Sequence, residues 1–508
     1  MNHWIVAPIL IPLVTGGLLL VLEGAPMAVK RAMSLAATLA LVAVAAGLMS
    51  IAAGGIQQIY YVGDWPAPFG IVLVLDQLSA LMLVLASVLA LASLLYSVAG
   101  DDAAGADFHP LFQFQLLGIN GAFLTGDLFN LFVFFEILLI ASYCLVVHGG
   151  GAARTRAGLH YVVLNLAGSA LFLIALGVIY GTLGTLNMAD LAVAVAAAPP
   201  EDLGLVAVAG LLLLAVFGLK AALLPLGFWL PPTYRAATAA AACLFAIMTK
   251  VGVYAILRVH VLIFIDSAQS GFSLATWLAP LALATMVLGT VGAVAASELR
   301  ATVSYLVVVS VGTLLASVAL LSRDGLAAAL YYMVHSTLIT GGLFLLTDLI
   351  ARQRAGAGAR LDLSQAVDQP ALLGALFFLG AVAVAGLPPL SGFAAKLYIL
   401  QAARTSFAAA WYWGVILVTG LFVILALSRA GTAIFWRTEG TEGDPRRVRA
   451  VEAISTGGLL AGALVLMILG QAVLEYTGSA AAQLLDPAGY VEAVLANTSV
   501  STPASLKE

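Results

Sequence analysis

Apolar stretches of about 20 residues, separated by short polar, glycine-containing or proline-containing breaks, follow one another along almost the whole chain. This is the length that a helix needs to cross the hydrocarbon core of a bilayer. The first stretch has no lysine or arginine ahead of its apolar core and no small-residue cleavage pattern, so we expect a transmembrane helix there and not a cleaved signal peptide. The pattern predicts an all-α polytopic membrane protein with about 14 transmembrane helices, at 4–22, 33–53, 71–96, 109–126, 128–148, 158–181, 203–224, 237–261, 274–295, 301–321, 326–349, 371–402, 408–435 and 453–474.

Composition supports this fold class and excludes several others. Of the 508 residues, 63% are hydrophobic and only 9% are charged, whereas about a quarter of the residues of a soluble domain are charged. No segment has the composition of a separate soluble domain, so we predict a single membrane domain over 1–508. The net charge of −4 gives no reason to expect a nucleic-acid partner.

The sequence predicts no cofactor and no metal site. Cys144 and Cys243 lie in apolar runs without a CxxC motif or a histidine partner, so they cannot supply a disulfide framework, a zinc site or an iron–sulfur site. The chain also has no phosphate-binding glycine loop and no Ser/His/Asp cluster. We therefore expect a transporter and not an enzyme.

Basic residues are distributed unequally between the connections. The even-numbered connections contain three: Arg258, Arg323 and Arg404. Because loops rich in lysine and arginine stay in the cytoplasm, we predict that the odd-numbered connections are cytoplasmic and that both termini lie on the outer side. The odd-numbered connections contain thirteen: Lys30, Arg31, Arg154, Arg156, Arg235, Arg300, Arg352, Arg354, Arg360, Arg437, Arg446, Arg447 and Arg449.

Two of the predicted helices are interrupted by prolines. The seventh runs directly into Pro225, Pro231 and Pro232, and the twelfth contains Pro388 and Pro389. Proline removes an amide donor and clashes with the preceding turn, so both helices should break, and broken helices are tolerated in a membrane where they face protein or water. The two breaks are five helices apart, an odd number, which predicts two repeats of inverted orientation. Paired interrupted helices in inverted halves indicate a transport pathway.

Charged residues within the apolar stretches are the candidates for chemistry. Glu136, Lys220, Lys250 and Lys396 lie inside predicted helices, where each charge costs on the order of 2.5–3.5 kcal/mol. Glu136 lies about 14 Å along its helix from Asp127, near the middle of the bilayer. A lysine can gain and lose its proton as its surroundings change, which an arginine cannot. We predict that these residues relay protons.

His335 is the fifth candidate, because it lies in mid-helix between the lysine-containing regions and imidazole is suited to proton transfer near neutral pH. We interpret Asp76 and Asp127 as helix caps, and Arg429 and His160 as side chains that reach the interface or form hydrogen bonds.

Five ordered segments resemble one family. They are TGDLFNLFVFFE, which ends at Glu136, GLKAALLPLGFWLPPTY, IMTKVGVYAILR, ALYYMVHSTL and GLPPLSGFAAK. They are similar to the antiporter-like subunits shared by respiratory complex I and Mrp cation/proton antiporters, and the resemblance covers essentially residues 1–475. The start MNHWIVAPILIPL, the form FWLPPTY and the length are most similar to the D-type group of Mrp (Pha, Mnh) subunits. Complex I relatives usually have histidine at the position of Tyr234.

The resemblance implies a 14-helix fold with two inverted five-helix repeats, 109–261 (helices 4–8) and 274–435 (helices 9–13), with helices 7 and 12 broken. It also implies an essential pair formed by Glu136 and Lys220, a central relay lysine at Lys250, a relay histidine at His335 and a terminal lysine at Lys396. Many relatives have a second lysine where this chain has Thr340. Thr337, nearby hydroxyls and water would then have to extend the relay through His335.

The resulting hypothesis is a proton-translocating subunit of a multisubunit Na⁺ or K⁺/H⁺ antiporter in the bacterial inner membrane, with other subunits of the complex, the lipid bilayer, protons and the cation as partners. Three alternatives remain at this stage. The chain could belong to a redox-driven proton pump such as complex I or a membrane-bound hydrogenase, serve as a scaffold, or transport by itself.

Overall fold

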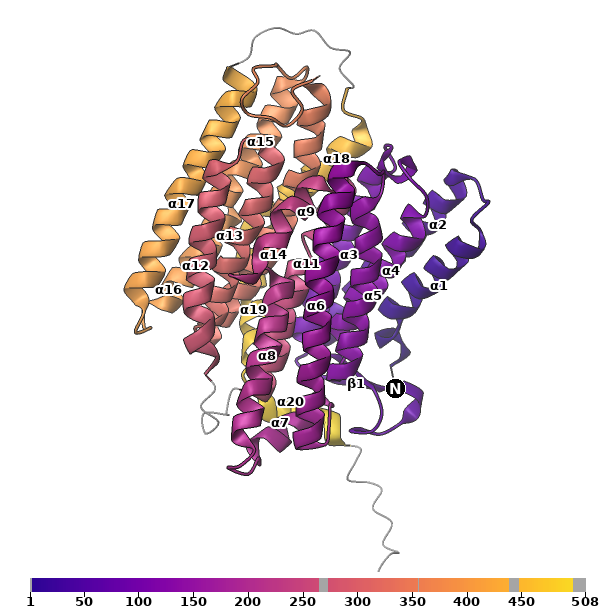
Figure 1. Ribbon diagram of the computed structural model, residues 1–508, viewed down its shortest axis with the longest axis vertical. Coiled ribbons are helices and arrows are strands. Elements are labelled where there is room, and N and C mark those ends of the chain that lie inside the picture. The colour runs from indigo at the N-terminus through magenta and orange to yellow at the C-terminus, as the bar shows by residue number, and fades with distance from the viewer. Residues whose placement is uncertain (1, 265–272, 355, 438–446, 497–508) are drawn as a thin grey trace, which may run out of the picture.

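Long helices packed side by side make up nearly all of the computed structural model, which describes residues 2–264, 273–354, 356–437 and 447–496 (Figure 1). Within these residues, eleven helical units are long and apolar enough to cross a membrane. Together with the shorter α1 and α15 and the 17-residue α4, they correspond one to one to the fourteen predicted stretches. The predicted all-α membrane fold is therefore confirmed.

The N-terminal part consists of two helices, a small hairpin and a third helix: α1 (Ala7–Val21), α2 (Met27–Ala52), β1 (Gln58–Tyr61), β2 (Val72–Leu75) and α3 (Gln77–Ser97). The strands are antiparallel, with Gln58 opposite Leu75 and Tyr61 opposite Val72. Short 3₁₀ turns accompany them at η1 (His3–Ile5), η2 (Val62–Asp64) and η3 (Asp101–Ala103).

The middle of the chain provides ten membrane units, several of them divided. Units 4–8 consist of α4 (Phe108–Leu124), α5 (Leu128–Val147), α6 (Ala152–Leu183), the surface helix α7 (Met188–Ala196), α8 (Leu203–Ala221), η4 (Leu226–Trp229), α9 (Leu230–Ala236), α10 (Ala239–Phe245), α11 (Met248–Ala255) and the π-helical η5 (Ile256–Val261). Units 9–13 consist of α12 (Leu274–Ala295), α13 (Leu299–Val318), α14 (Arg323–Gln353), α15 (Pro370–Ala385), α16 (Ser391–Ala403), α17 (Ala409–Gly431) and the π-helical η7 (Thr432–Trp436). Three helices end the described chain: α18 (Ala450–Ile468), α19 (Gly470–Leu484) and α20 (Pro487–Leu495).

Three sequence predictions need correction. The stretch 71–96 begins too early, because residues 72–75 form strand β2 and the helix starts at Gln77. Arg258 does not lie in a connection: it is in η5, with 3% of its surface exposed. The last stretch, 453–474, is divided at Leu469, after which α19 and α20 continue to Leu495. Arg446, one of the predicted loop residues, lies outside the described residues.

Both predicted breaks are present, and a further irregularity was not predicted. Helix 7 breaks after Ala221, the last residue of α8, and the next residue, Ala222, has a left-handed backbone with φ +65°. Helix 12 stops at Ala385, followed by Gly386 with φ +78°. In helix 8, the eighth membrane unit (Ala239–Val261), the backbone amides of Ala246, Ile247 and Lys250 each donate to the carbonyl three residues earlier. The helix is therefore wound more tightly immediately before and at Lys250.

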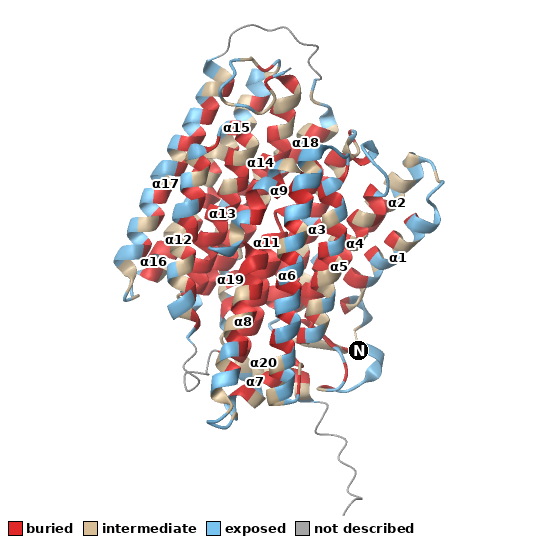
Figure 2. Cartoon of the chain, in the orientation of Figure 1, coloured by how far each residue is buried: buried red, intermediate tan, exposed pale blue. Residues whose placement is uncertain are grey.

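Burial is highest along the central axis (Figure 2). The unit Ala239–Val261 is buried throughout its apolar window, and Arg323–Gln353 is buried over 83% of it. Large apolar side chains such as Leu421, Val163 and Ile140 are exposed on outer helices, as expected where lipid replaces water as the solvent. Together with Leu299–Val318, which is buried over 89% of its window, these two units have the most enclosed surroundings.

Several local features occur once in units 4–8 and again in units 9–13. Gly118 and Gly121 of α4 pack against α5 so closely that an added Cβ would lie 2.5 Å from the Leu138 amide nitrogen and 2.2 Å from the Phe134 ring. Gly289 and Gly292 of α12 have the same spacing and meet α13, at 2.8 Å from the Val309 amide nitrogen and 2.2 Å from the Tyr305 ring.

Two isolated β-bridges also correspond. One joins Asp127, at the start of α5, to Asn187 after α6, and the other joins Glu298, at the start of α13, to Arg360 after α14. Each is made by a pair of 2.9 Å backbone hydrogen bonds, Leu128 to Leu186 with Met188 to Gly126, and Leu299 to Ala359 with Leu361 to Ser297. In each group of five units, the fifth helix ends in a π-helical segment: η5 in units 4–8 and η7 in units 9–13.

Candidate functional site

Lys220 lies in the last turn of α8, next to the break in helix 7, and is 5% exposed. Its ammonium lies 3.4 Å from the carbonyl oxygen and 3.3 Å from the side-chain oxygen of Asn165, on α6. Asn165 is fully buried. The buried cation therefore has two acceptors, both supplied by one residue that the sequence analysis did not single out.

Glu136 reaches the same turn of α6 from the other side. Its carboxylate accepts a hydrogen bond from the Ser169 hydroxyl, and that hydroxyl also lies 3.1 Å from the carbonyl oxygen of Asn165. Among the described residues, Glu136 and Lys220 do not form a direct ion pair. Asn165 and Ser169 lie between them instead. Their signal in the sequence is a pair of polar residues four apart in an otherwise apolar helix, which places both on one helix face.

The break in helix 7 is held against α6 by aromatic residues. Tyr161 stacks on Trp229 with ring centroids 4.9 Å apart, and the Trp229 indole donates to the carbonyl of Leu219. The Asn165 side-chain amide in turn donates to the Tyr161 carbonyl. These contacts fix the position of Asn165 relative to the carbonyls that precede Lys220.

Lys250 is completely buried on α11, and its ammonium nitrogen has no hydrogen-bond partner within the described chain. The neighbouring Thr249 hydroxyl is also without a partner there. Buried polar groups are bonded to protein or to internal water, so water is the expected partner at this position. Gly252, two residues further on, lets α11 touch the break in helix 7: a Cβ there would be 2.5 Å from the Ala221 nitrogen.

His335 and Lys396 meet at the second broken helix: Lys396 lies in it, on α16, and His335 lies on the neighbouring α14. The His335 Nδ1 lies 2.8 Å from the hydroxyl of Ser391, the first residue of α16. The Lys396 ammonium donates to the carbonyls of Val384 (3.2 Å) and Ala385 (2.9 Å), in the last turn of α15. A cation at the carboxyl end of a helix is stabilised by its dipole and satisfies carbonyls that lack helical partners.

One internal cavity connects these two residues. Its volume is about 20 Å³, enough for about one water molecule. His335, Thr340 and Lys396 line it together with the hydroxyl residues Ser310, Thr313, Tyr332, Ser336 and Thr419. Thr340, the departure from many relatives, thus contributes a hydroxyl to the cavity instead of an amine.

The five predicted relay residues therefore form two groups. Glu136 and Lys220 are joined through Asn165 and Ser169, and Lys250 is next to them through the contact of Gly252. His335 and Lys396 share a cavity. In the described chain no side-chain hydrogen bond joins Lys250 to His335, although α11 packs against α13 and α13 supplies Ser310 to the cavity.

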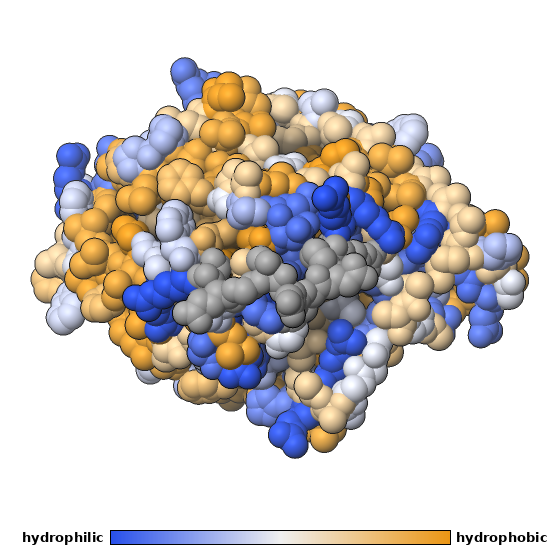
Figure 3. Space-filling view, turned by 90° about the horizontal axis from the view of Figure 1, so that it is seen from above, coloured by the Kyte–Doolittle hydropathy of each residue, from blue (hydrophilic) through white to orange (hydrophobic). Residues whose placement is uncertain are grey.

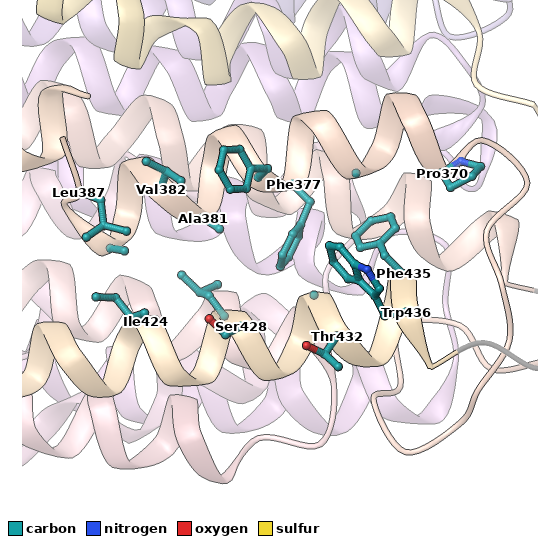
Figure 4. A pocket seen from close by; sticks show the side chains of 15 residues that line it. Pro370, Phe377, Ala381, Val382, Leu387, Ile424, Ser428, Thr432, Phe435 and Trp436 are labelled. Atoms are coloured by element: carbon teal, nitrogen blue, oxygen red, sulfur yellow. The ribbon is translucent and has the colours of Figure 1, made fainter. Parts of the chain in front are cut away.

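A large apolar groove on the molecule has different chemistry. It has a volume of about 550 Å³ between α15 and α17–η7, and Figure 4 shows Phe377, Val382 and Leu387 on one side facing Ile424 and Trp436 on the other. It contains no charged side chain. The candidate site is therefore the buried polar line and not this apolar groove.

Asp76 and Asp127 are helix caps, as predicted: they accept hydrogen bonds from the amides of Ser79 (2.8 Å) and Asn130 (2.7 Å). The sequence analysis did not find the second role of Asp76, which forms a 2.6 Å ion pair with Arg258. Arg429 donates to the carbonyl of Ala296, in agreement with its predicted hydrogen-bonding role.

Comparison with known proteins shows the family of this chain. The family described as NADH:quinone oxidoreductase/Mrp antiporter, transmembrane, matches residues 125–424. The D component of a probable K⁺/H⁺ antiporter of Rhizobium meliloti is 43% identical, over 97% of this chain and 98% of its own length. The D component of the Na⁺/H⁺ antiporter of Bacillus subtilis is 38% identical, over 97% of this chain and the whole of the relative.

Solved structures show the same fold. A chain of the Mrp complex from Dietzia sp. superposes with a TM-score of 0.87 at 30% identity, covering 97% of this chain and all of that one. A chain of an archaeal membrane-bound sulfane sulfur reductase superposes with a TM-score of 0.89 at 24% identity, covering 97% and 100%. At that identity the second likeness concerns the fold alone.

Proposed function

We propose that this chain, which belongs to the NADH:quinone oxidoreductase/Mrp antiporter membrane family, is the D-type subunit of a multisubunit monovalent cation (Na⁺ or K⁺)/proton antiporter and carries the proton. Its D-type relatives are antiporter components, so it is a transporter subunit and not an enzyme. It works with the other subunits of a hetero-oligomeric complex of the Mrp kind.

The proton path begins at Glu136 and Lys220. The Ser169 hydroxyl has one hydrogen and two acceptors, the Glu136 carboxylate and the Asn165 carbonyl. When it donates to Glu136, the Asn165 carbonyl is free for the Lys220 ammonium. When Glu136 takes up a proton, its carboxyl can donate to the Ser169 oxygen, and the hydroxyl turns to Asn165 and competes with Lys220. Protonation of Glu136 therefore weakens the hold on the Lys220 ammonium, which favours release of its proton toward Lys250.

The path continues through Lys250 and His335 to Lys396. Water bonded to the unpartnered Lys250 amine accepts the proton, and the hydroxyl residues around His335 carry it to the cavity that Lys396 lines. The Lys396 ammonium is held by the carbonyls of Val384 and Ala385. These carbonyls stabilise the charged form at the end of the path, and loss of the proton leaves a neutral amine that can accept the next one.

Two inverted repeats, 109–261 and 274–435, account for this layout. The paired glycines of α4 and α12, the two β-bridges, the terminal π-helices and the two broken helices support the assignment.

One hydrogen bond couples the halves next to Lys220: the amide of Leu224, inside the break of helix 7, donates to the Thr285 hydroxyl of α12. A change at Lys220 can thus reach the second half through the backbone of the break.

We place the chain in the bacterial inner membrane with both termini on the outer side. With Arg258 inside helix 8, only Arg323 and Arg404 of the counted basic residues remain at the even-numbered connections, so the asymmetry is larger than the sequence alone indicated. Figure 3 views the end of the molecule that we assign to the cytoplasm, where hydrophilic side chains gather around the middle of the face.

The observation that carries this proposal is the buried Lys220 ammonium at a helix break, joined through Asn165 and Ser169 to the Glu136 carboxylate. The test is cation-induced collapse of ΔpH in everted vesicles that contain the complete complex. We expect Na⁺ or K⁺ to collapse ΔpH in the wild type and not in Lys220→Ala at equal amounts of assembled complex. Absence of any cation effect in the wild type, or full activity of the variant, would reject the proposal.

A further inference from the structure

A buried ion pair lies outside the proposed relay. The Arg258 guanidinium contacts the Asp76 carboxylate at 2.6 Å, and each side chain is only 3% exposed. Arg258 also donates to the Tyr254 hydroxyl at 3.2 Å, and its guanidinium carbon lies 5.4 Å from the ring centres of Tyr254 and Tyr490. Two aromatic rings and one carboxylate thus fix this permanent charge in an enclosed site.

The pair lies on the same face of helix 8 as Lys250. Lys250, Tyr254 and Arg258 follow one another at intervals of four residues, and such residues lie on one side of a helix. Arg258 is about 12 Å from Lys250 along the helix axis, at 1.5 Å per residue. Its guanidinium lies over the Tyr490 ring of α20, and α20 lies beside α7 at one end of the molecule (Figure 1).

The C-terminal helix α20 closes this end. Tyr490, on α20, is 2% exposed and stacks over Arg258. The Tyr61 hydroxyl of the hairpin donates to the carbonyl of Val494, and α20 packs against α7. The enclosed space next to Arg258 is therefore built from three distant parts of the chain.

Polar atoms without a hydrogen-bond partner occur at both ends of the interval of about 12 Å between Lys250 and Arg258. Within the described residues, the Lys250 ammonium has no partner, and at the other end neither Arg258 Nη2 nor the Tyr490 hydroxyl has one. Buried atoms of this kind are bonded by internal water. A line of water from Lys250 to Arg258 would conduct protons toward α20 and discharge the relay before His335 unless something stopped it.

Arginine has the properties needed to stop it. Its guanidinium does not release its proton in proteins, so it cannot pass one on as lysine does. A fixed positive charge in a narrow polar passage also repels protons and cations. Asp76 keeps the guanidinium in place, because the amide of Ser79 holds the same carboxylate from the other side.

We propose that the Asp76–Arg258 pair, covered by Tyr490, is a proton barrier that closes the α20 end of helix 8, so that a proton on Lys250 leaves toward His335. The barrier rests on the proposed function, since it needs Lys250 to carry protons. A purely structural pair that joins α3 to helix 8 would have no effect on proton conduction, provided that the complex assembles.

The test is passive proton conductance of the purified complex in liposomes, with a pH dye inside and choline as the cation on both sides. Arg258→Lys keeps the charge and the pairing but introduces an amine that can pass a proton on. We expect its ΔpH to decay about tenfold faster than in the wild type, which needs the barrier to fall by only about 1.4 kcal/mol. The matched control is Arg429→Lys, on the exposed side of α17. Its ΔpH should decay at the wild-type rate.

A second variant separates conduction from damage. Adding Lys250→Ala to Arg258→Lys should abolish the leak, because the leak must pass through Lys250. A leak that persists without Lys250, or an assembled Arg258→Lys complex as tight as the wild type, overturns the proposal. If Arg258→Lys does not assemble, the neutral pair Asp76→Asn with Arg258→Gln leaves no buried charge unpaired and should leak, and a tight membrane with that pair also overturns it. No transported cation is present, so the result does not depend on whether antiport itself is observed.

Discussion

At the scale of single residues, the central feature is that hydroxyl and amide groups separate the charged groups of the proposed relay. Ser169 and Asn165 stand between Glu136 and Lys220, and Ser391 contacts His335. A direct ion pair would hold both charges strongly, whereas a hydroxyl with two acceptors can change its partner without moving the backbone. We infer that this arrangement allows a proton to pass along the charged residues, whereas a direct ion pair would hold the proton on one of them.

Ser169→Ala tests the hydroxyl directly. It removes the donor to Glu136 and leaves the carboxylate unpartnered, and hydrogen bonds to charged groups contribute about 1.5–3 kcal/mol. We expect cation-induced proton uptake by the assembled complex to fall by about tenfold, which corresponds to about 1.4 kcal/mol. Ser169→Thr, which keeps the hydroxyl, should retain most of the activity. Equal activity of Ser169→Ala and the wild type would show that Glu136 and Lys220 communicate by another route.

The sequence was sufficient to indicate the charged residues of the proposed relay but not the neutral ones. A lysine in an apolar helix is conspicuous because it is unfavourable there. Asn165 and Ser169 are uncharged, and two neutral polar residues four positions apart in a helix are a weaker signal. The pairing of Asp76 with Arg258 joins residues far apart in the chain, and no local pattern indicates it. Because Arg258 lies near the end of the predicted stretch 237–261, it was counted with the connection that follows that stretch.

At the scale of helices, prolines identified the breaks in helices 7 and 12 correctly. The tightening of helix 8 was missed, because Ala246, Ile247 and Met248 are ordinary helix residues. Tertiary contacts produce it: the Tyr234 hydroxyl donates to the carbonyl of Phe245 at that point.

The close approach of paired helices gives a prediction for the proposed repeats. A methyl group at Gly118 or Gly289 would meet backbone nitrogen at 2.5 or 2.8 Å, and overpacking of this kind costs about 1–3 kcal/mol. Gly118→Ala and Gly289→Ala should both lower the amount of assembled complex on native gels and its unfolding temperature. Gly177→Ala, where nothing lies within 4 Å, is the control. If only one of the two glycine variants is destabilised, the two helix pairs are not equivalent.

At the scale of the whole molecule, ionic contacts join distant helices at the end that we assign to the cytoplasm. Arg352 of α14 contacts Asp348, Asp101 before α4, and Glu452 of α18. Composition and periodicity predicted the membrane fold because each apolar stretch must cross the bilayer independently. They did not predict these contacts, or the folding of the C-terminal region into α19 and α20 over the opposite end, because such docking depends on surfaces that form only after the helices assemble.

The Asp102 cluster at the same end predicts an acid-sensitive component of stability. Burial alone would raise the pKa of the Asp102 carboxyl, but hydrogen bonds from His109 and Arg31 lower it to about 2, below the value of about 3.9 in an unfolded chain. A lowered pKa stabilises the folded state above about pH 4, and this contribution is lost as the pH falls toward 2.

The measurement is the unfolding temperature of the purified complex between about pH 5 and about pH 2.5, the range over which this contribution is lost. We expect the wild type to lose more stability than Asp102→Asn over this range. Asp362→Asn, which removes an exposed partner of Arg360, should follow the wild type. Parallel curves for the wild type and Asp102→Asn would show that the Asp102 cluster does not contribute.

The most direct test of the central claim compares Lys220→Arg with Lys220→Ala in the assembled complex, with cation-driven proton movement as the readout. Arginine keeps the positive charge next to Asn165 but does not release its proton. If Lys220 carries the proton, Lys220→Arg is as inactive as Lys220→Ala, although its charge is preserved. If Lys220→Arg transports protons at the wild-type rate, the charge alone is required, and the account of Lys220 as a proton carrier is wrong.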